Sequence, residues 1–372
     1  MTNRLSLLLS LALCVPMVEV ADASSRIIYA SSEGVVCDGK TDNTGALLRI
    51  FQSEVRGVSV VFPPGECLFR KQIPMQLNRA SITGAGGAAT ILVFDGENKN
   101  DDIISIRRSY GSVISHFGIW SRNRRWGGAA LHVLLSSYIT IEDMHINDFD
   151  THLHSLWTGV WIDQPNFVTV SNVYVQAQKD ALLISAKGVG TPYQYDVFVN
   201  SSKFSDSGVG VHVAGGIDNV HLDTSEVTSN INNFIDDNSI FHAVNQEIYI
   251  GSGVVFDQSL LDNVIINDRA CNRANYGVVS VGGVITHAKH GSGIVLKSFP
   301  NCELTISSPL IAQNQLDGIE LFDRSAYVTT ASSVFISDNG RYGEYYPFRS
   351  NRVHFNAVLI DNKKTERADN NN

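Results

Sequence analysis

The sequence predicts an all-β protein whose chain winds into a single-stranded parallel β-helix. Short β-type segments recur along the 372 residues at intervals of roughly 23 to 30, a period typical of a solenoid. Apolar residues alternate within each segment, so every second side chain points to one buried face. One such strand cannot bury that face alone, whereas stacked coils cover one another and pair their backbone groups. The ten segments start at Val113, Ile139, Val168, Val197, Val220, Ile248, Val278, Leu304, Val328 and Val353.

The composition fits one long domain. Apolar residues make up 44% of the chain and charged residues 17%, a balance that suits many half-buried strands and does not suit disorder or a coiled coil. A solenoid grows by adding coils, so residues 24–364 can form a single domain although they exceed an ordinary core. The net charge of −9 argues against general affinity for nucleic acid. The polar residues 365–372 are predicted to be mobile, and no oligomeric state is predicted.

Residues 1–23 resemble a signal peptide. Arg4 precedes an apolar stretch at residues 5–18 that is short for a membrane span, and Ala21-Asp22-Ala23 fits a cleavage site. An uncleaved membrane anchor is the alternative, but no charged stop-transfer cluster follows the apolar stretch. We therefore predict a secreted or periplasmic protein that has no membrane contact once the signal peptide is cleaved.

Cysteine usage agrees with an oxidising compartment. Cys14 would leave with the signal peptide, so the mature chain would keep four cysteines, enough for two disulfides. Proximity in the sequence favours Cys37 with Cys67 and Cys271 with Cys302, although three pairings are possible and free buried thiols are the alternative. The absence of a Cys-x-x-Cys motif leaves a redox dithiol or a structural zinc site without support.

The stretch at about residues 30–95 predicts an N-terminal cap on the solenoid. One helical face carries apolar side chains, and short polar residues just before it can cap the helix. Such an amphipathic helix can cover the open end of the first coil, where a strand edge would otherwise meet water. Residues 58–62 then read as a buried strand that Pro63-Pro64-Gly65 ends with a turn. The apolar face of the helix comprises Ala46, Leu47, Ile50, Phe51 and Val55.

The same stretch resembles a known family. The motif Asp38-Gly39-Lys40-Thr41-Asp42-Asn43-Thr44, the helix after it and Phe62-Pro63-Pro64-Gly65 look like the N-terminal module of the rhamnogalacturonase/epimerase-like pectate lyase superfamily. Beyond this module the period resembles that of the wider pectin-lyase-like class. The resemblance implies a right-handed β-helix and an exported protein that acts on polysaccharide, often acidic, in a groove along one sheet. The family also includes phage tailspikes and exopolysaccharide-processing proteins.

The densest polar run of the coils is a candidate for catalysis. Asp148, Asp150, His152 and His154 would share one face of an extended segment. Carboxylates there could act as acid and base on a glycosidic bond or hold a Ca²⁺ that bridges to a uronate, and the histidines could accept a proton in β-elimination. A solvated loop is the plain alternative, no specific metal-ligand motif is present, and no cofactor is required. Further candidates follow at Trp157, Trp161 and Asp163.

The next coils add an acid and a base. Asp180 directly precedes a predicted strand, and His212 would face outward if the valines beside it face inward. The layout vaguely resembles polygalacturonase-type glycoside hydrolases, which carry Asn-Thr-Asp, Asp-Asp and Gly-His-Gly on successive coils. This chain has Trp157-Thr158-Gly159, Lys179-Asp180 and Gly208-Val209-Gly210 at those places. Only Asp180 matches, which puts an inverting hydrolase mechanism in doubt because that mechanism needs two carboxyl groups.

A basic stretch precedes these coils. Arg122, Arg124, Arg125 and Trp126 could bind an anionic polymer, since guanidinium groups pair well with carboxylates. Alternatively, these arginines decorate a loop and pair with neighbouring acids. We therefore predict an exported lyase or glycoside hydrolase of an acidic polysaccharide, with Asp150, Asp163, Asp180, His152 and His212 as candidate catalytic residues. Arg122, Arg124, Arg125, Trp126, Trp157 and Trp161 are the candidate substrate contacts, and a non-catalytic glycan-binding or exopolysaccharide-assembly protein is the alternative.

Overall fold

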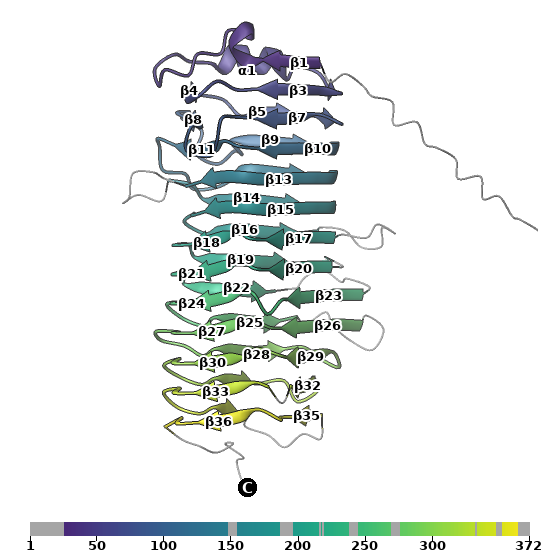
Figure 1. Ribbon diagram of the computed structural model, residues 1–372, viewed down its shortest axis with the longest axis vertical. Helices are drawn as coiled ribbons and strands as arrows, with labels where there is room; N and C mark the ends of the chain where they lie inside the picture. The colour runs from purple at the N-terminus through teal and green to yellow at the C-terminus, as the bar shows by residue number, and fades with distance from the viewer. Residues whose placement is uncertain are drawn as a thin grey trace, which may run out of the picture.

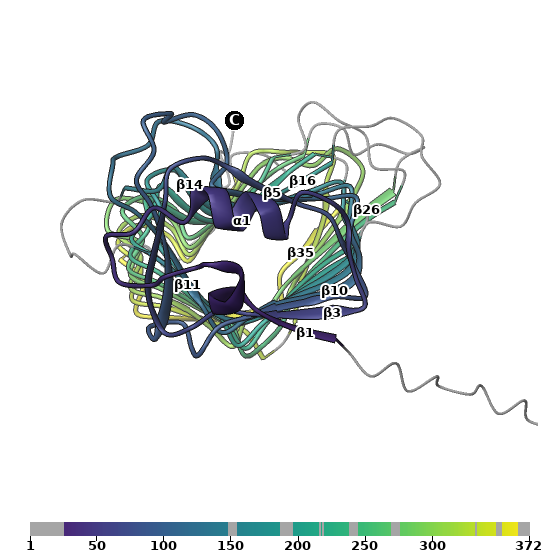
Figure 2. The ribbon, with the colours of Figure 1, turned by 90° about the horizontal axis from the view of Figure 1, so that it is seen from above.

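The chain folds into a long prism of stacked β-coils (Figure 1). The computed structural model describes residues 26–147, 155–186, 196–215, 217, 219–237, 245–268, 276–331, 333–346 and 352–363. Strands of successive coils pair in parallel, as in β13 with β15 and β16 with β19. Seen along the prism, these strands form three faces around a common interior (Figure 2). The interior is apolar and continuous from Ala30 to Tyr346.

The first face begins each coil. Its strands are β1 (Arg26–Tyr29), β3 (Val58–Val61), β7 (Ser81–Thr83), β10 (Tyr110–Ser115), β13 (Ser137–Ile146), β15 (Asn166–Val175), β17 (Asp196–Asn200), β20 (Asn219–Asp223), β23 (Asn245–Ile250), β26 (Tyr276–Val281), β29 (Glu303–Ile306), β32 (Tyr327–Thr330) and β35 (Val353–His354). Two short strands, β2 (Val55–Arg56) and β6 (Leu77–Asn78), pair with each other, and β6 also pairs with the first residue of β10.

The second face continues from the first. Its strands are β4 (Gly65–Phe69), β8 (Thr90–Phe94), β11 (Gly118–Ser121), β18 (Lys203–Ser205), β21 (Glu226–Thr228), β24 (Val255–Asp257), β27 (Val284–Thr286), β30 (Leu310–Ala312), β33 (Phe335–Ser337) and β36 (Val358–Ile360). The long strands β13 and β15 bend across both faces, because their last residues pair with β11 and β18.

The third face is a separate 11-stranded sheet. Its strands are β5 (Ile73–Met75), β9 (Ile104–Arg107), β12 (Ala129–Leu134), β14 (Thr158–Asp163), β16 (Asp180–Ser185), β19 (Val209–Ala214), β22 (Asn232–Asp236), β25 (Val264–Asn267), β28 (Ile294–Ser298), β31 (Ile319–Leu321) and β34 (Glu344–Tyr345). Alternate residues such as Leu182 and Ile184 fill the interior, so the residues between them lie on the outer side of this sheet.

The predicted β-helix is confirmed. Each of the ten residues at which the sequence predicts a strand start lies in a strand of the first face, from Val113 in β10 to Val353 in β35. The predicted strand at residues 58–62 corresponds to β3, and the chain turns at the two prolines before β4 begins at Gly65. Apolar alternation identified these strands because it follows directly from burial of one strand face.

A short helix, α1 (Thr44–Ile50), lies at the N-terminal end of the prism after a 3₁₀ turn at Ala30–Glu33 (Figures 1 and 2). The helix is shorter than its apolar pattern predicted: Val55 lies in β2, not on the helix. Asn43 stands at the N-cap position but makes no capping bond, since its side chain bonds the backbone of Val36 and Leu68 instead. A role of α1 as a cap stays a prediction.

The predicted disulfide between Cys37 and Cys67 is present. Cys302 is also disulfide-bonded, and its predicted partner Cys271 lies outside the described residues. Among the residues that the structure describes, no helix has the length and apolar character needed to span a membrane.

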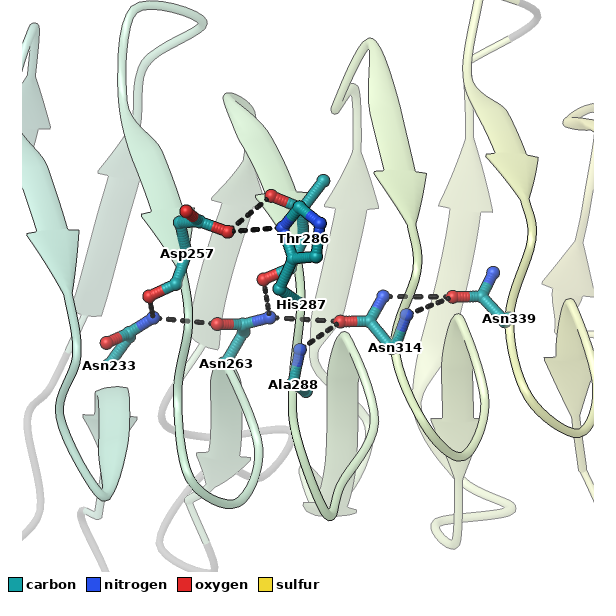
Figure 3. A network of polar contacts seen from close by, with 8 residues as sticks. All are labelled: Asn233, Asp257, Asn263, Thr286, His287, Ala288, Asn314 and Asn339. Atoms are coloured by element: carbon teal, nitrogen blue, oxygen red, sulfur yellow. Dashed lines mark hydrogen bonds and ion pairs between the residues drawn. The ribbon is translucent and has the colours of Figure 1, made fainter.

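A row of buried asparagines holds the corner between the second and third faces (Figure 3). Each side-chain amide except that of Asn362 donates to the side-chain oxygen of the next asparagine in the row at 2.7–3.0 Å, and most also donate to a backbone carbonyl. Neighbours in the row lie on the same coil (Asn230 and Asn233), on adjacent coils, or two coils apart (Asn263 and Asn314). Residues just before the turn take left-handed backbone conformations, for example Gln313 and Asp338. The asparagines therefore satisfy carbonyls that the sharp corner would leave unpaired. The row comprises Asn230, Asn233, Asn263, Asn314, Asn339 and Asn362.

Candidate functional site

Asp180 and His212 meet at the edge where the strands of the third face begin. Asp180 is the first residue of β16 and is fully buried. Its Oδ1 lies 3.0 Å from Nδ1 of His212, which is in β19 on the next coil. The ammonium of Lys179 lies 3.5 Å from the other carboxylate oxygen. The sequence predicted both residues as candidates, and the structure brings them together.

This contact fixes what the imidazole can do. An ionised carboxylate can only accept a hydrogen bond, so Nδ1 of His212 carries the hydrogen when Asp180 is ionised. Nε2 then holds the free lone pair and is available as a base. The side chain of His212 is 18% exposed, and none of the described residues forms a hydrogen bond with its Nε2. The pair is therefore an oriented base supported by a buried acid.

Asp180 and His212 lie on adjacent strands of the third face. Asp180 stands in register with Val209, and Leu183 stands in register with His212. His212 lies on the outer side because Val211 and Val213 beside it are fully buried. Gly208 lets the two coils approach closely, since a Cβ there would lie only 2.7 Å from the carbonyl oxygen of Lys179.

A second pair with the same geometry lies on the N-terminal side. Asp102 precedes β9, and its Oδ2 lies 2.7 Å from Nδ1 of His132 in β12. The imidazole of His132 stacks on the indole of Trp161, with ring centroids 4.1 Å apart and planes 1° apart. The side chain of His132 is 7% exposed against 18% for that of His212, so His132 is the less accessible of the two imidazoles. Sequence reasoning missed a role for Asp102, although its spacing of 30 residues from His132 is close to the 32 residues between Asp180 and His212.

Asp163 lies far from Asp180 along the strands. Asp163 ends β14 and stands in register with Ser185, whose hydroxyl donates to its Oδ1 at 3.1 Å. Ser185 comes five residues after Asp180 in the same strand, so about 16 Å of strand separates the two carboxylates. Glycoside hydrolases need their two carboxyl groups within about 10 Å. Asp163 and Asp180 are therefore not a hydrolase pair.

The predicted cationic residues divide into three environments. Arg124 is exposed, donates to the side chain of Gln178 at 3.0 Å and lies over the exposed ring of Trp126. This contact places Arg124 and Trp126 beside the turn that leads to Asp180. Arg122 points to the N-terminal module, where it donates to the carbonyl of Gly39 at 2.8 Å.

Arg125 is the third case. Its side chain is 1% exposed, lies over Phe94 and donates to the carbonyl oxygens of Asn98 and Asp101. Burial lowers the pKa of its guanidinium to about 10. A buried guanidinium that already binds backbone carbonyls cannot contact a polymer, so we leave Arg125 out of the proposed site.

The tryptophans of the third face are partly buried. Trp157 lies one coil before Lys179, whose backbone N–H donates to its carbonyl at 2.9 Å. Trp161 donates from its indole to the hydroxyl of Ser185 at 2.9 Å. The predicted candidates Asp150 and His152, together with Asp148 and His154, lie outside the described residues.

Comparison with known proteins identifies the family. The model of the family described as "Rhamnogalacturonase A/epimerase, pectate lyase-like" matches residues 27–236, more than half of the chain. The chain belongs to this family. Curated protein sequences give no significant match.

Solved structures resemble this rhamnogalacturonase A/epimerase, pectate lyase-like protein at 12–13% identity, which shows the fold alone. The Azotobacter vinelandii mannuronan C-5 epimerase AlgE4 A-module has a TM-score of 0.66 at 12% identity, over 90% of this chain and 96% of that one. The AlgE6 A-module of the same organism has a TM-score of 0.51 at 12% identity, over 89% and 98%. The catalytic unit of the GH87 α-1,3-glucanase of Streptomyces thermodiastaticus strain HF3-3 has a TM-score of 0.56 at 13% identity, over 90% of this chain and 68% of that one.

Membership of this family supports a carbohydrate-acting β-helix protein. Among the described residues of this family member, no group of three or more His, Cys, Asp and Glu side chains could hold a metal ion. The Ca²⁺ site considered for residues 148–154 stays a prediction, because that segment lies outside the described part of the chain.

Aromatic rings form a row along the first face. Tyr110, Tyr138, Phe167, Phe198 and His221 contact one another coil by coil, with ring centroids 4.9–5.5 Å apart. The contacts between Tyr138 and Phe167 and between Phe198 and His221 are stacked, so these rings cover one another's faces.

Proposed function

We propose that this protein is an enzyme that modifies an acidic polysaccharide by transferring a proton at the carbon next to a uronate carboxylate. The hydrogen-bonded pair of Asp180 and His212 carries the proposal, because it combines a buried acid with a partly exposed base. In this reaction Nε2 of His212 takes the proton from C5 of the sugar. Asp180 stabilises the imidazolium that forms and keeps the ring in place.

Cationic side chains near this pair would make the C5 proton removable. Lys179 is exposed in the turn before β16, Arg124 is exposed and contacts Gln178 of that turn, and both can bind the sugar carboxylate. Neutralising that carboxylate stabilises the negative charge left when C5 loses its proton. The exposed ring of Trp126 under Arg124 offers a surface for the sugar itself.

Two outcomes balance the electrons left at C5. In elimination they form a C4=C5 double bond, the C4–O bond breaks and the departing oxygen takes up a proton. In epimerisation a proton returns to C5 from the opposite side and no bond of the chain breaks. The AlgE4 module is named a mannuronan C-5 epimerase, and a C5 proton transfer is the step proposed here for His212. Hydrolysis by Asp163 and Asp180 is disfavoured by the strand distance between them.

The same proposal includes export. The signal-like residues 1–23 and the disulfide between Cys37 and Cys67 both favour a secreted or periplasmic location, where disulfides persist. An extracellular or periplasmic polysaccharide would then be the polymer that the protein meets.

Incubation with a panel of uronate polymers in D₂O tests the proposal. Elimination gives ultraviolet-absorbing unsaturated ends, epimerisation places deuterium at C5, and hydrolysis gives new reducing ends with neither signal. We expect one of the first two signals. We also expect Asp180→Asn and His212→Gln to lower its rate at least about 100-fold, as loss of a general base does.

His221→Gln is the matched control, since His221 is also an outward, half-buried histidine but lies on the first face. It should leave the rate unchanged. Reducing ends alone would refute proton transfer at C5, and full activity of His212→Gln would remove that residue from the site. Binding of polymer with no product of any kind would favour the non-catalytic glycan-binding alternative.

A further inference from the structure

A groove runs along the corner between the second and third faces, directly beside the candidate site. It encloses about 520 Å³ and draws its lining from five successive coils. Four steps between coils, at about 4.8 Å each, make it roughly 19 Å long. Coil spacing is comparable to the repeat of pyranose units, so the groove can follow several sugars. Its main lining residues are Gln178, Asp206, Ile231, Gln258, Leu260 and Lys289.

The groove continues from the proposed catalytic pair. Gln178 lines its N-terminal end, lies two residues before Asp180, and accepts the hydrogen bond from Arg124. Gly208 lies in the groove wall and has no side chain to fill it, and a Cβ there would collide with backbone. A polymer bound at Arg124 and Asp180 can therefore extend into the groove without a barrier from this wall.

The floor of the groove has the mixed character of a carbohydrate site. Ile231 and Leu260 are each 44% exposed, which is unusual for large aliphatic residues unless something covers them. Asp206 is exposed and its carboxylate already accepts a bond from Gln176 at 2.6 Å. Aliphatic side chains can contact the C–H faces of sugar rings, and the other carboxylate oxygen of Asp206 can accept a hydrogen bond from a sugar hydroxyl.

Lys289 supplies a positive charge at the C-terminal end. Its side chain is exposed, and no ion pair links it to a carboxylate of the described residues. The backbone N–H of Lys289 donates to the carbonyl of Ser259, which fixes the main chain at this point. The side-chain ammonium is available to bind a ligand. A free cation about four coils from Asp180 suits a carboxylate on a distant unit of the same polymer.

We propose that this corner groove is an extended binding track for an acidic polysaccharide, in which Lys289 holds the carboxylate of a sugar several units from the one that reacts. The proposal rests on the function proposed above. It predicts that the protein binds long oligomers better than short ones, and that Lys289 contributes only when the oligomer is long enough to reach it.

Equilibrium binding of uronate oligomers of increasing length to His212→Gln protein tests the track without any turnover. In this background Lys289→Gln should weaken binding of long oligomers about two- to fivefold, the effect of one exposed ion pair, and Lys289→Glu should weaken it more. Oligomers of one or two units should bind equally well to all variants. Polymer whose carboxyl groups have been reduced should bind equally well to the parent protein and to Lys289→Gln.

Lys71→Gln is the control, since Lys71 is also exposed but lines a different hollow at the N-terminal end. It should leave binding unchanged at every length. Equal binding of long oligomers to Lys289→Gln and to its parent would overturn the track, and so would an equal loss at every length. Because the readout is binding, the track can stand even if no uronate polymer gives a product, and it can fall while the catalytic pair survives.

Discussion

Replacement of Asn263 tests whether the asparagine row holds the coils together. Its side chain makes three hydrogen bonds: it donates to the carbonyl of Thr286 and to Oδ1 of Asn314, both at 3.0 Å, and accepts from Asn233 at 2.7 Å (Figure 3). Asn263 is fully buried, so water cannot replace any of these bonds in the folded protein.

Asn263→Ala should lower the free energy of unfolding by about 3 kcal/mol, taking about 1 kcal/mol for each lost bond. The loss stays near this value because the neighbouring side chains keep other partners. The amide of Asn233 still donates to the carbonyl of Asp257, and Oδ1 of Asn314 still accepts from the backbone of Ala288. Urea unfolding of the full chain, followed by circular dichroism, measures the shift in midpoint.

Asn263→Asp is the sharper test. The new carboxyl keeps the hydrogen bond from Asn233 but, even when protonated, has one donor for the two acceptors on Thr286 and Asn314, and burial raises its pKa above the value in the unfolded chain. The folded protein then holds a proton that the unfolded chain has released, so the deficit of this variant should grow as the pH rises above about 4. Asn123→Ala, at an exposed asparagine, should stay within about 0.5 kcal/mol of wild type. An Asn263→Ala midpoint equal to that of Asn123→Ala would refute the reasoning.

Two further predictions concern the ends of the solenoid. Cys37→Ser with Cys67→Ser opens a loop of 30 residues, which the chain-entropy relation values at about 3.6 kcal/mol; a urea midpoint equal to that of the oxidised wild type would contradict this. Burial raises the pKa of Glu320, so the folded protein binds this proton more tightly than the unfolded chain does. The protein therefore loses stability as the pH rises from the pKa of Glu320 in the unfolded chain to its higher pKa in the folded protein. Glu320→Gln should flatten the pH profile of stability and leave Arg341 bound to Asp317, whereas a profile parallel to that of wild type would count against the assignment.

The sequence was most informative where burial alone sets the pattern. Val168 and Val197 could be placed in strands of one face because every second residue of these segments is apolar. The third face was harder to predict, because its corners depend on left-handed backbone at residues such as Leu135 and Gln164. These positions are not glycines, so the sequence does not mark them as left-handed. Val55 was wrongly assigned to the helix because the helical spacing of apolar residues continues past Ile50, where the helix ends.

The site was predictable only in part. Alternation placed His212 on the outer side of its strand, and the polar residue before the preceding strand gave Asp180. Arg125 shows the limit of such reasoning: its charge indicates a solvent contact, yet the folded chain buries it on two backbone carbonyls. Sequence pattern reports which side of a strand a residue takes, but it does not report which loop will close over that residue.

The two Asp–His pairs show how one scaffold can give different outcomes. Both join an acid that precedes or begins a strand of the third face to a histidine on the following coil, and both use Nδ1 of the histidine. His132 is 5% exposed and stacks on Trp161, so its pair contributes packing to the sheet. His212 is more exposed and stands in register with the aliphatic residues Leu183 and Ile235, so its pair is open to a ligand. The coil repeat thus supplies the oriented pair, and the side chain on the neighbouring coil decides whether the imidazole can act as a base.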